Sequence, residues 1–297
     1  MIKKIIYTLL TGAFVFSMVS CMGIDNFDAP DAHVTGNIID ISHTPARNII
    51  IGNDGDIRIW ERSFTGRPDV VPQGIRIRQG GTYNNERLFA GTYDMLPINL
   101  PIWTPDTVFR VPIGRNTVTQ NFEVHSLLHV VDFTAELSSM ADSIILRARL
   151  HAPATEREIR FNGERVIASI PPLQRVRAFV SLHNVFYGSG SPMDIGEYDN
   201  ARYWANFPGG TDWWSIATDG RTSNTTHQVA AAARPNVSVE NGWFTIKLDI
   251  PERQRGQTFY VTMGARAFGG PTGSATASIN DGQRYNIAEG IRIFVPR

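Results

Sequence analysis

The densest group of side chains that could bind a ligand lies in residues 197–215. It holds three of the six tryptophans and two of the eight tyrosines, mixed with Asp, Asn, Arg and Gly. Sugar rings stack their C–H faces on aromatic rings, and their hydroxyls bond carboxylates, amides and guanidinium groups. The segment therefore predicts a carbohydrate-binding surface, with these expected ligand contacts: Tyr198, Asp199, Arg202, Tyr203, Trp204, Asn206 and Trp214. Residues 208–210, Pro-Gly-Gly, predict a loop rather than a strand at Trp204.

The same aromatic residues have a structural alternative. Large aromatic side chains in β proteins are mostly buried, and adjacent residues on a strand point to opposite faces. Trp213 and Trp214 are adjacent, so a strand at this place would not direct both rings at one ligand. Rings that plug the end of a sandwich therefore remain the alternative to a binding surface.

Motifs for catalysis and for cofactor binding are absent from the sequence. Lys247 is the only lysine after residue 4, so no Gly-Lys-Ser/Thr phosphate loop is present, and residues 187–191 lack the Gly-x-Ser-x-Gly spacing. The seven histidines are scattered, and the i,i+4 pair His125 and His129 favours a structural role over metal binding. A glycosidase would need two carboxylates held at a defined distance from each other. The candidates for such a pair are Asp194, Glu197, Asp199 and Asp212. We predict no catalytic, cofactor-binding or metal-binding residue, and an enzyme is not expected.

The first twenty residues predict export. Lys3 and Lys4 precede an apolar run over residues 5–19, which is the pattern of a signal peptide and short for a spanning helix. Residues 18–21, Met-Val-Ser-Cys, resemble the bacterial lipobox, in which the cysteine thiol receives diacylglycerol. The sequence predicts a lipoprotein signal peptide at 1–20, lipidation of Cys21 and an acidic tether at 21–30. A secreted protein without lipid is the alternative.

Length, charge and cysteine content narrow the protein class. The chain has 297 residues with 28 basic and 28 acidic side chains, and 42% of its residues are hydrophobic, which excludes a disordered or polytopic membrane protein. A formal net charge of zero gives no reason to expect nucleic acid as a partner. Cys21 is the single cysteine, so the chain forms no internal disulfide. The length favours two domains.

Hydrophobic residues after residue 30 alternate with polar ones. Examples are residues 57–60, 74–78, 144–150, 243–250, 259–263 and 291–295. A period of two with Gly-rich and Asn-rich turns predicts antiparallel sheets with one solvated face, hence an all-β sandwich protein. The outward arginines favour solvated faces, with binding of an anionic glycan as the alternative: Arg58, Arg76, Arg78, Arg147 and Arg149. A short helix is predicted at residues 228–234, ending at Pro235.

A domain boundary is predicted near residue 125. Residues 109–112 and 122–124 have the pattern of a closing hairpin, and a new strand pattern starts at Leu127. No Pro/Gly/Ser-rich linker separates the two halves, so the sandwiches are expected to abut. The predicted domains are 31–124 and 125–297.

Several motifs resemble a two-domain Bacteroidota outer-membrane lipoprotein family of unknown function. In the first domain these are residues 25–32 (DNFDAPDA), 34–40 (VTGNIID), 57–61 (IRIWE), 81–85 (GTYNN) and 87–93 (RLFAGTY). In the second they are residues 176–181 (VRAFVS) and 259–266 (FYVTMGAR). The resemblance implies a prealbumin-like sandwich, a fold also seen in the regulatory domain of carboxypeptidases, followed by an immunoglobulin-like sandwich. It also implies polysaccharide-utilisation loci of the starch-utilisation type, where such proteins accompany a TonB-dependent transporter and its partner lipoprotein.

These observations together favour a non-enzymatic lipoprotein that binds a glycan or glycan fragment. It would be anchored to outer-membrane lipid through acylated Cys21 and exposed at the cell surface, without a cofactor. A structural accessory subunit of the transport complex, without sugar binding, is the alternative. A glycoside-acting hydrolase is the least favoured of the three.

Overall fold

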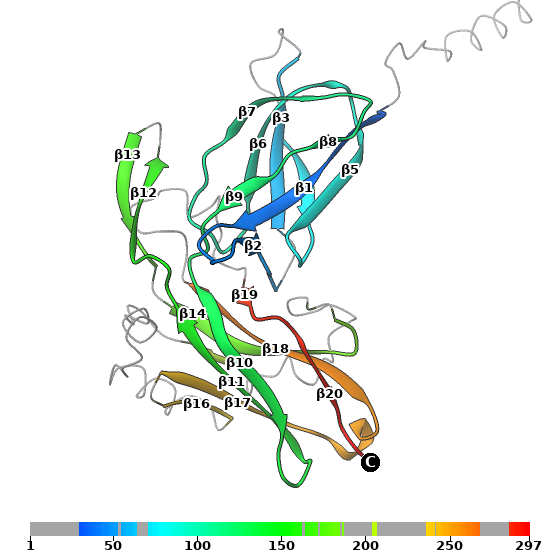
Figure 1. The fold of residues 1–297 in the computed structure, drawn as a ribbon, viewed down its shortest axis with the longest axis vertical. Coiled ribbons are helices and arrows are strands. Elements are labelled where there is room, and N and C mark those ends of the chain that lie inside the picture. The colour runs from blue at the N-terminus through cyan, green and yellow to red at the C-terminus, as the bar shows by residue number, and fades with distance from the viewer. Residues whose placement is uncertain are drawn as a thin grey trace, which may run out of the picture.

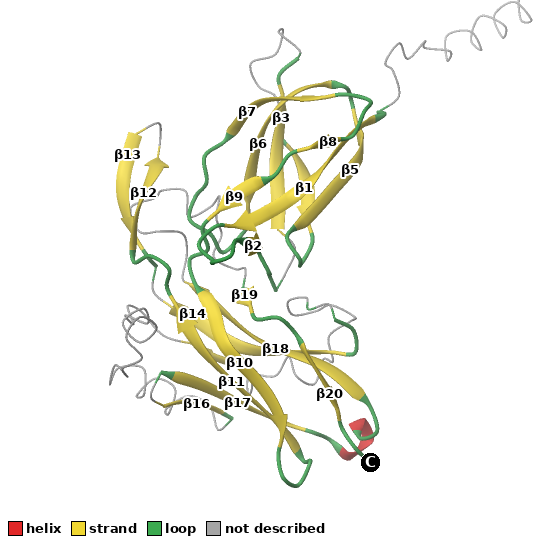
Figure 2. Ribbon diagram, viewed as in Figure 1, coloured by secondary structure: helices red, strands yellow, loops and turns green. Residues whose placement is uncertain are grey.

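The computed structural model describes residues 30–52, 55–63, 71–161, 164–171, 173–184, 186, 204–206, 236–240, 242–267 and 285–297. Across these residues the regular structure is strand, apart from one 3-10 helix, η3 (Glu252–Gln254) (Figure 2). The prediction of an all-β protein is confirmed. Among the same residues no helix is long and apolar enough to cross a membrane. The predicted signal peptide, Cys21, nearly all of the tether and the predicted helix at 228–234 lie outside the described residues.

The first sandwich is formed by one curled sheet of nine strands (Figure 1). Its order is β2-β1-β5-β4-β3-β6-β7, and β8 and β9 also pair with β1. The strands are β1 (Ala32–Asp40), β2 (Arg47–Asn48), β3 (Gly55–Glu61), β4 (Gln73–Ile77), β5 (Thr82–Leu88), β6 (Gly91–Ile98), β7 (Val108–Ile113), β8 (Val118–Thr119) and β9 (Phe122–Val124).

The core of this sandwich follows directly from the period of two. Alternate residues of β1 are buried, from Ala32 to Asp40, and the isoleucines of β3 and β4 face the same core. Burying a Val or Ile side chain contributes about 1.5–3 kcal/mol, so alternation of this kind fixes which face of each strand points inward.

The predicted closing hairpin at residues 109–124 is wrong. β7 pairs antiparallel with β6, whereas β8 and β9 pair parallel with β1, matching Val34 to Val118 and Ile38 to Phe122. The sheet curls enough for the chain after β7 to reach β1, where the His33 amide donates to the Gly114 carbonyl at 3.3 Å. The chain therefore closes the sandwich by crossing to β1, with which β8 and β9 both pair in parallel.

The second sandwich packs a four-stranded sheet against a five-stranded sheet, and a separate hairpin projects from it. The sheets have the orders β10-β11-β17-β16 and β15-β14-β18-β19, with β20 also on β18. The strands are β10 (His129–Leu137), β11 (Ser143–His151), β12 (Glu156–Phe161), β13 (Glu164–Ser169), β14 (Leu173–Ser181), β15 (Trp204–Asn206), β16 (Val237–Glu240), β17 (Trp243–Asp249), β18 (Thr258–Ala267), β19 (Asn286–Ile287) and β20 (Ile291–Phe294). A second core cluster fills this body.

The prediction of one solvated face holds for β11 and β17 but is wrong for β14 and β18. Arg147 and Lys247 alternate with buried neighbours, as predicted. In β18, however, Thr262 is 0% exposed and donates its hydroxyl to the Ala288 carbonyl at 2.8 Å. The outer face of β14 and β18 is covered because it adjoins the first sandwich.

A third hydrophobic cluster lies at this junction of the two sandwiches. Phe179, Phe186, Tyr285 and Ile287 are buried there, and Ile50 of the first sandwich packs against them. Hydrogen bonds cross the same junction, from the Gly52 amide to the Tyr285 carbonyl at 2.9 Å and from the Asn286 side chain to the Pro101 carbonyl at 3.2 Å. The two sandwiches thus share an interface of backbone pairing and apolar packing.

Candidate functional site

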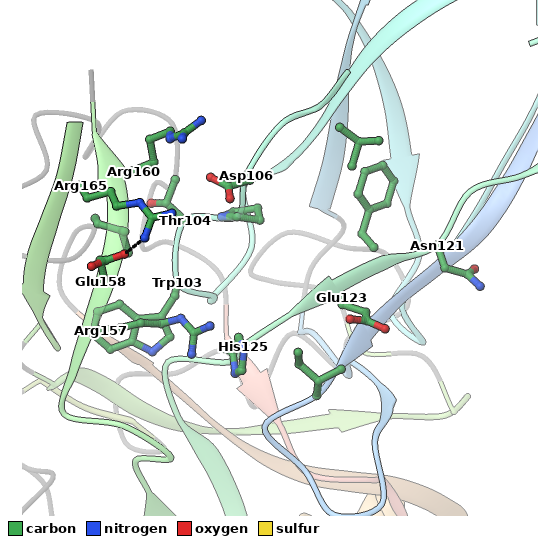
Figure 3. A pocket seen from close by; sticks show the side chains of 15 residues that line it. Trp103, Thr104, Asp106, Asn121, Glu123, His125, Arg157, Glu158, Arg160 and Arg165 are labelled. Carbon is green, nitrogen blue, oxygen red and sulfur yellow. Dashed lines mark hydrogen bonds and ion pairs between the residues drawn. The ribbon is translucent and has the colours of Figure 1, made fainter. Parts of the chain in front are cut away.

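A concavity lies between the first sandwich and the β12–β13 hairpin. The hairpin pairs only with itself, with Ile159 opposite Val166, and extends beside the first sandwich (Figure 1). Together they enclose about 440 Å³, which we call the hairpin cleft. The polar side chains and the tryptophan that line it are Trp103, Thr104, Asp106, Asn121, Glu123, His125, Arg157, Glu158, Arg160 and Arg165 (Figure 3). Phe122 lines it as well.

Trp103 forms the inner wall of the hairpin cleft. Its amide donates to the His125 carbonyl at 2.9 Å, so the segments before β7 and after β9 run side by side. The Trp103 side chain is 2% exposed and packs into the core of the second sandwich. Its indole Nε1–H has no hydrogen-bond partner among the described residues. A buried donor without a partner costs about 1–3 kcal/mol.

Arg157 and His125 stand next to this donor (Figure 3). Burial lowers the pKa of the Arg157 guanidinium, which nevertheless stays charged. Burial also lowers the pKa of His125, and the positive charge of Arg157 lowers it further. Within the described part of the chain, no carboxylate forms an ion pair with Arg157. The inner part of the cleft therefore combines a neutral imidazole, a free N–H and an uncompensated positive charge.

The rim of the hairpin cleft is richer in acceptors. Asp106, Asn121 and Glu123 come from the first sandwich and are exposed. On the hairpin, Arg165 Nη1 lies 2.8 Å from Glu158 Oε1, so these two charges compensate each other (Figure 3). Carboxylates, an amide and guanidinium groups around one cleft can bond the hydroxyls of a polar ligand.

A second, more open concavity lies at the other side of the domain junction. It encloses about 820 Å³ and is lined by Arg47, Arg76 and Arg78, with Asn184 and Glu289 from the second sandwich. The outward direction predicted for Arg76 and Arg78 is confirmed, since both are exposed.

Arg147 and Arg149 differ from simple solvated residues. Their guanidinium carbons lie 5.1 and 5.3 Å from the ring centroid of Trp243, and Arg149 Nε is 2.6 Å from Asp132 Oδ2. Cation–π contacts and an ion pair therefore connect the side chains on this face of β11 and β17.

A buried cluster of Asp40, His43 and His129 joins the two sandwiches. Asp40 Oδ2 accepts from His129 Nε2 at 3.0 Å, and its other oxygen accepts from the Ser42 amide at 3.0 Å. The ligand atoms of the three residues lie within 4.8 Å of one another, as in a metal site. However, the two imidazoles are stacked, with centroids 3.5 Å apart at 12°. Because a ring nitrogen lone pair lies in the ring plane, two such rings do not point at one ion in this arrangement.

The amino-acid sequence does not predict this cluster. Its members come from the end of β1, the loop that follows and the start of β10, and His129 lies far from the other two along the chain. The ring centroids of His129 and His151 also lie 6.1 Å apart. Spacing along the chain gives no signal for such a group, because pairing and packing between sandwiches bring it together.

The predicted carbohydrate-binding residues are described only in part. Trp204 and Asn206 lie in β15, which pairs with the edge of β14 and places Trp204 opposite Arg177. The prediction of a loop at Trp204 is therefore wrong, because the unpaired edge of β14 offers backbone partners to these three residues. Tyr198, Asp199, Arg202, Tyr203 and Trp214 lie outside the described residues, so their role stays a prediction.

Solved structures with the same fold come from Bacteroidales. A "putative carbohydrate binding protein" of Bacteroides uniformis is 16% identical with a TM-score of 0.55, over 89% of this chain and 99% of its own. A DUF3823 family protein of the same species is 14% identical with a TM-score of 0.54, over 90% of this chain and 100% of its own. One of Parabacteroides merdae is 12% identical with a TM-score of 0.51, over the same shares. No curated protein matches the chain.

A family profile also matches the first sandwich. It is described as the N-terminal domain of a protein of unknown function, DUF3823, and it covers residues 32–125. This range contains every strand of the nine-stranded sheet. Residues 32–125 are therefore similar to the N-terminal domain of the DUF3823 family.

Proposed function

We propose that this protein is a surface lipoprotein that binds a carbohydrate in the hairpin cleft and does not act on it chemically. The observation that carries the proposal is the grouping of polar side chains of both kinds around one cleft. Donors come from Trp103, His125 and Arg157, and acceptors come from Asp106 and Glu123. The name of the Bacteroides uniformis protein with the same fold adds support.

Binding without catalysis is the simpler use of this cleft. Hydrolysis of a glycoside by the common mechanism needs two opposed carboxyl groups, one of which stays protonated through burial. Asp106 and Glu123 are exposed, and Glu158 is engaged by Arg165. These groups suit hydrogen bonds to sugar hydroxyls better than proton transfer to a leaving group.

The location and partners belong to the same proposal. Lipidation of Cys21 would anchor the chain to the outer membrane, and the tether at 21–30 would hold the first sandwich near the lipid surface. A TonB-dependent transporter and its partner lipoprotein are the proposed neighbours. The accessory subunit without sugar binding remains the second candidate, favoured by the apolar and hydrogen-bonded junction between the two sandwiches.

The test is calorimetric titration of the mature chain against a panel of neutral and acidic polysaccharides. We expect at least one ligand, and Glu123→Ala should weaken its binding about tenfold or more, since a hydrogen bond to a charged group is lost. Glu136→Ala is the matched control, because Glu136 is an exposed strand residue of β10 outside the cleft.

Two results would contradict the proposal in different ways. An absence of binding across the panel would leave the accessory-subunit function. Binding that is lost in Trp204→Ala but kept in Glu123→Ala would move the site from the hairpin cleft to the segment predicted from the sequence.

A further inference from the structure

Among the described residues, the inner part of the hairpin cleft presents an unpartnered donor and a positive charge without an ion-pair partner. Trp103 Nε1–H is buried without a partner among the described residues. The guanidinium of Arg157 lines the same cleft and forms no ion pair there within the described chain. His125 completes this group (Figure 3).

Such a group is unfavourable when it is left empty. A half-buried guanidinium has lost part of its hydration, and a buried N–H without a partner has lost all of it. An anionic oxygen would compensate the charge of Arg157 and accept from the indole at the same time. A neutral hydroxyl could accept a hydrogen bond but would leave the charge uncompensated.

The geometry of a guanidinium limits further which anionic groups fit the cleft. Arg presents a planar fork of N–H donors that matches two oxygens of a carboxylate or sulfate. The indole N–H supplies a further donor beside the fork. We infer that the inner part of the hairpin cleft binds the anionic group of an acidic carbohydrate, a uronate carboxylate or a sulfate ester. The inference rests on the proposed function and specifies its substrate class.

The charges at the rim agree with this arrangement. Asp106 and Glu123 lie exposed at the mouth, Glu158 is paired with Arg165, and Arg160 adds a positive charge on the hairpin. A ligand with its acid group inward would present only hydroxyls to Asp106 and Glu123. A ligand in the reverse orientation would place its charge against two carboxylates, so the rim selects one direction of binding.

The experiment compares ligands that share their sugar rings and linkages and differ in whether they carry the anionic group. Oligogalacturonate and its fully methyl-esterified form share every ring and linkage, and a sulfated galactan and its desulfated form do the same for sulfate. Calorimetry with the mature chain should show binding of an acidic member of one pair. Affinity should fall about tenfold or more for the neutral member, because the charge-assisted hydrogen bonds are lost. The pair that responds distinguishes carboxylate from sulfate.

Variants locate the anion in the cleft. Arg157→Ala should weaken binding of the acidic probe about tenfold or more and abolish its preference over the neutral form. Arg157→Lys keeps the charge without the fork and should retain part of the preference. Trp103→Phe removes the Nε1–H while keeping an aromatic ring and should reduce affinity for the acid. Arg87→Ala is the control, because Arg87 is an exposed β5 arginine outside the cleft. A thermal melt of each variant confirms folding.

The outcomes separate the two proposals. Equal affinity for the acidic and neutral members, or an unchanged preference in Arg157→Ala, would overturn the acidic-ligand inference and leave carbohydrate binding in place. A lack of any bound carbohydrate would overturn the proposed function itself. If Arg157→Ala fails to fold, Arg157→Lys and Trp103→Phe decide the same question.

Discussion

Asp40 at the end of β1 accepts a hydrogen bond from His129 at the start of β10, with 3.0 Å between Oδ2 and Nε2. Asp40 is 1% exposed and also accepts from Ser42 and Ser126. Burial alone would raise the pKa of Asp40, but the hydrogen bonds from His129, Ser126 and Ser42 outweigh it and hold the pKa well below its usual range. The carboxylate is thus a charged centre that links the two sandwiches.

Replacing this carboxylate should destabilise the protein. Asp40→Asn keeps the size of the side chain but removes the charge and turns one acceptor into a donor that faces other donors. We expect the free energy of unfolding at pH 7 to fall by about 1.5–3 kcal/mol, the contribution of a hydrogen bond to a charged group. Urea denaturation measures it, with the exposed Asp106→Asn as control. Equal stability of the two variants would contradict a linking role for Asp40.

The histidine stack predicts a pH dependence of stability. Burial lowers the pKa of His43 to about 4, and the neighbouring His129 and Arg47 act in the same direction, against the opposite effect of Asp40. An unfolded histidine has a pKa near 6.5, so between about pH 4 and 6.5 the unfolded chain binds more protons than the folded one. The free energy of unfolding should therefore fall as pH decreases through this window.

Urea midpoints at several pH values between 4.5 and 7.5 check this dependence. His43→Asn should flatten the profile, and His125→Asn separates the contribution of His125, whose pKa is also lowered. Below the range of His43 the carboxylate of Asp40 adds a further loss of the same sign, since its folded pKa is lowered as well. If His43→Asn leaves the pH dependence of the free energy of unfolding unchanged, the pKa of His43 does not differ between the folded and the unfolded chain.

Local pattern was sufficient to predict the strands that have one face in the core. The alternation in β1, β11 and β17 corresponds to their buried and exposed residues almost position by position. It failed for β18, because Thr262 is a polar residue that is fully buried and donates its hydroxyl to the Ala288 carbonyl. It failed again for β9, because the choice between a local hairpin and a parallel pairing with β1 depends on how far the sheet curls.

The candidate site could not be predicted because its members are remote in sequence. Trp103, His125 and Arg157 belong to a connection, the start of the second sandwich and a projecting hairpin. None of them lies in an unusual stretch of sequence. The cleft forms because the segment at Trp103 pairs with the segment at His125 and the hairpin lies beside them.

The predicted lipid anchor can be tested without structural information. Cys21→Ala removes the thiol that would be acylated, so the variant should leave the membrane fraction. Inhibition of the lipoprotein signal peptidase with globomycin should cause the uncleaved wild-type form to accumulate. Fractionation followed by immunoblotting measures both effects, and Met22→Ala serves as a neighbouring control. Membrane residence of Cys21→Ala equal to that of wild type would rule out this anchor.

The crossing from β7 to β8 makes one glycine critical. A Cβ atom on Gly36 of β1 would lie 1.9 Å from the backbone carbonyl oxygen of Gln120, next to the pairing of β1 with β8. The obstacle is backbone, so no side chain can rotate away, and Gly36→Ala must separate the two strands. We expect the free energy of unfolding to fall by at least the roughly 1–3 kcal/mol that is typical of overpacking.

Gly74→Ala in β4 is the matched control, because its Cβ would meet no atom within 4 Å. It should be neutral, or stabilising by about 0.4–1 kcal/mol through the less flexible unfolded chain. Thermal and urea unfolding of both variants measure the difference. Equal stability would mean that the parallel closure of the first sandwich by β8 and β9 is not formed as described.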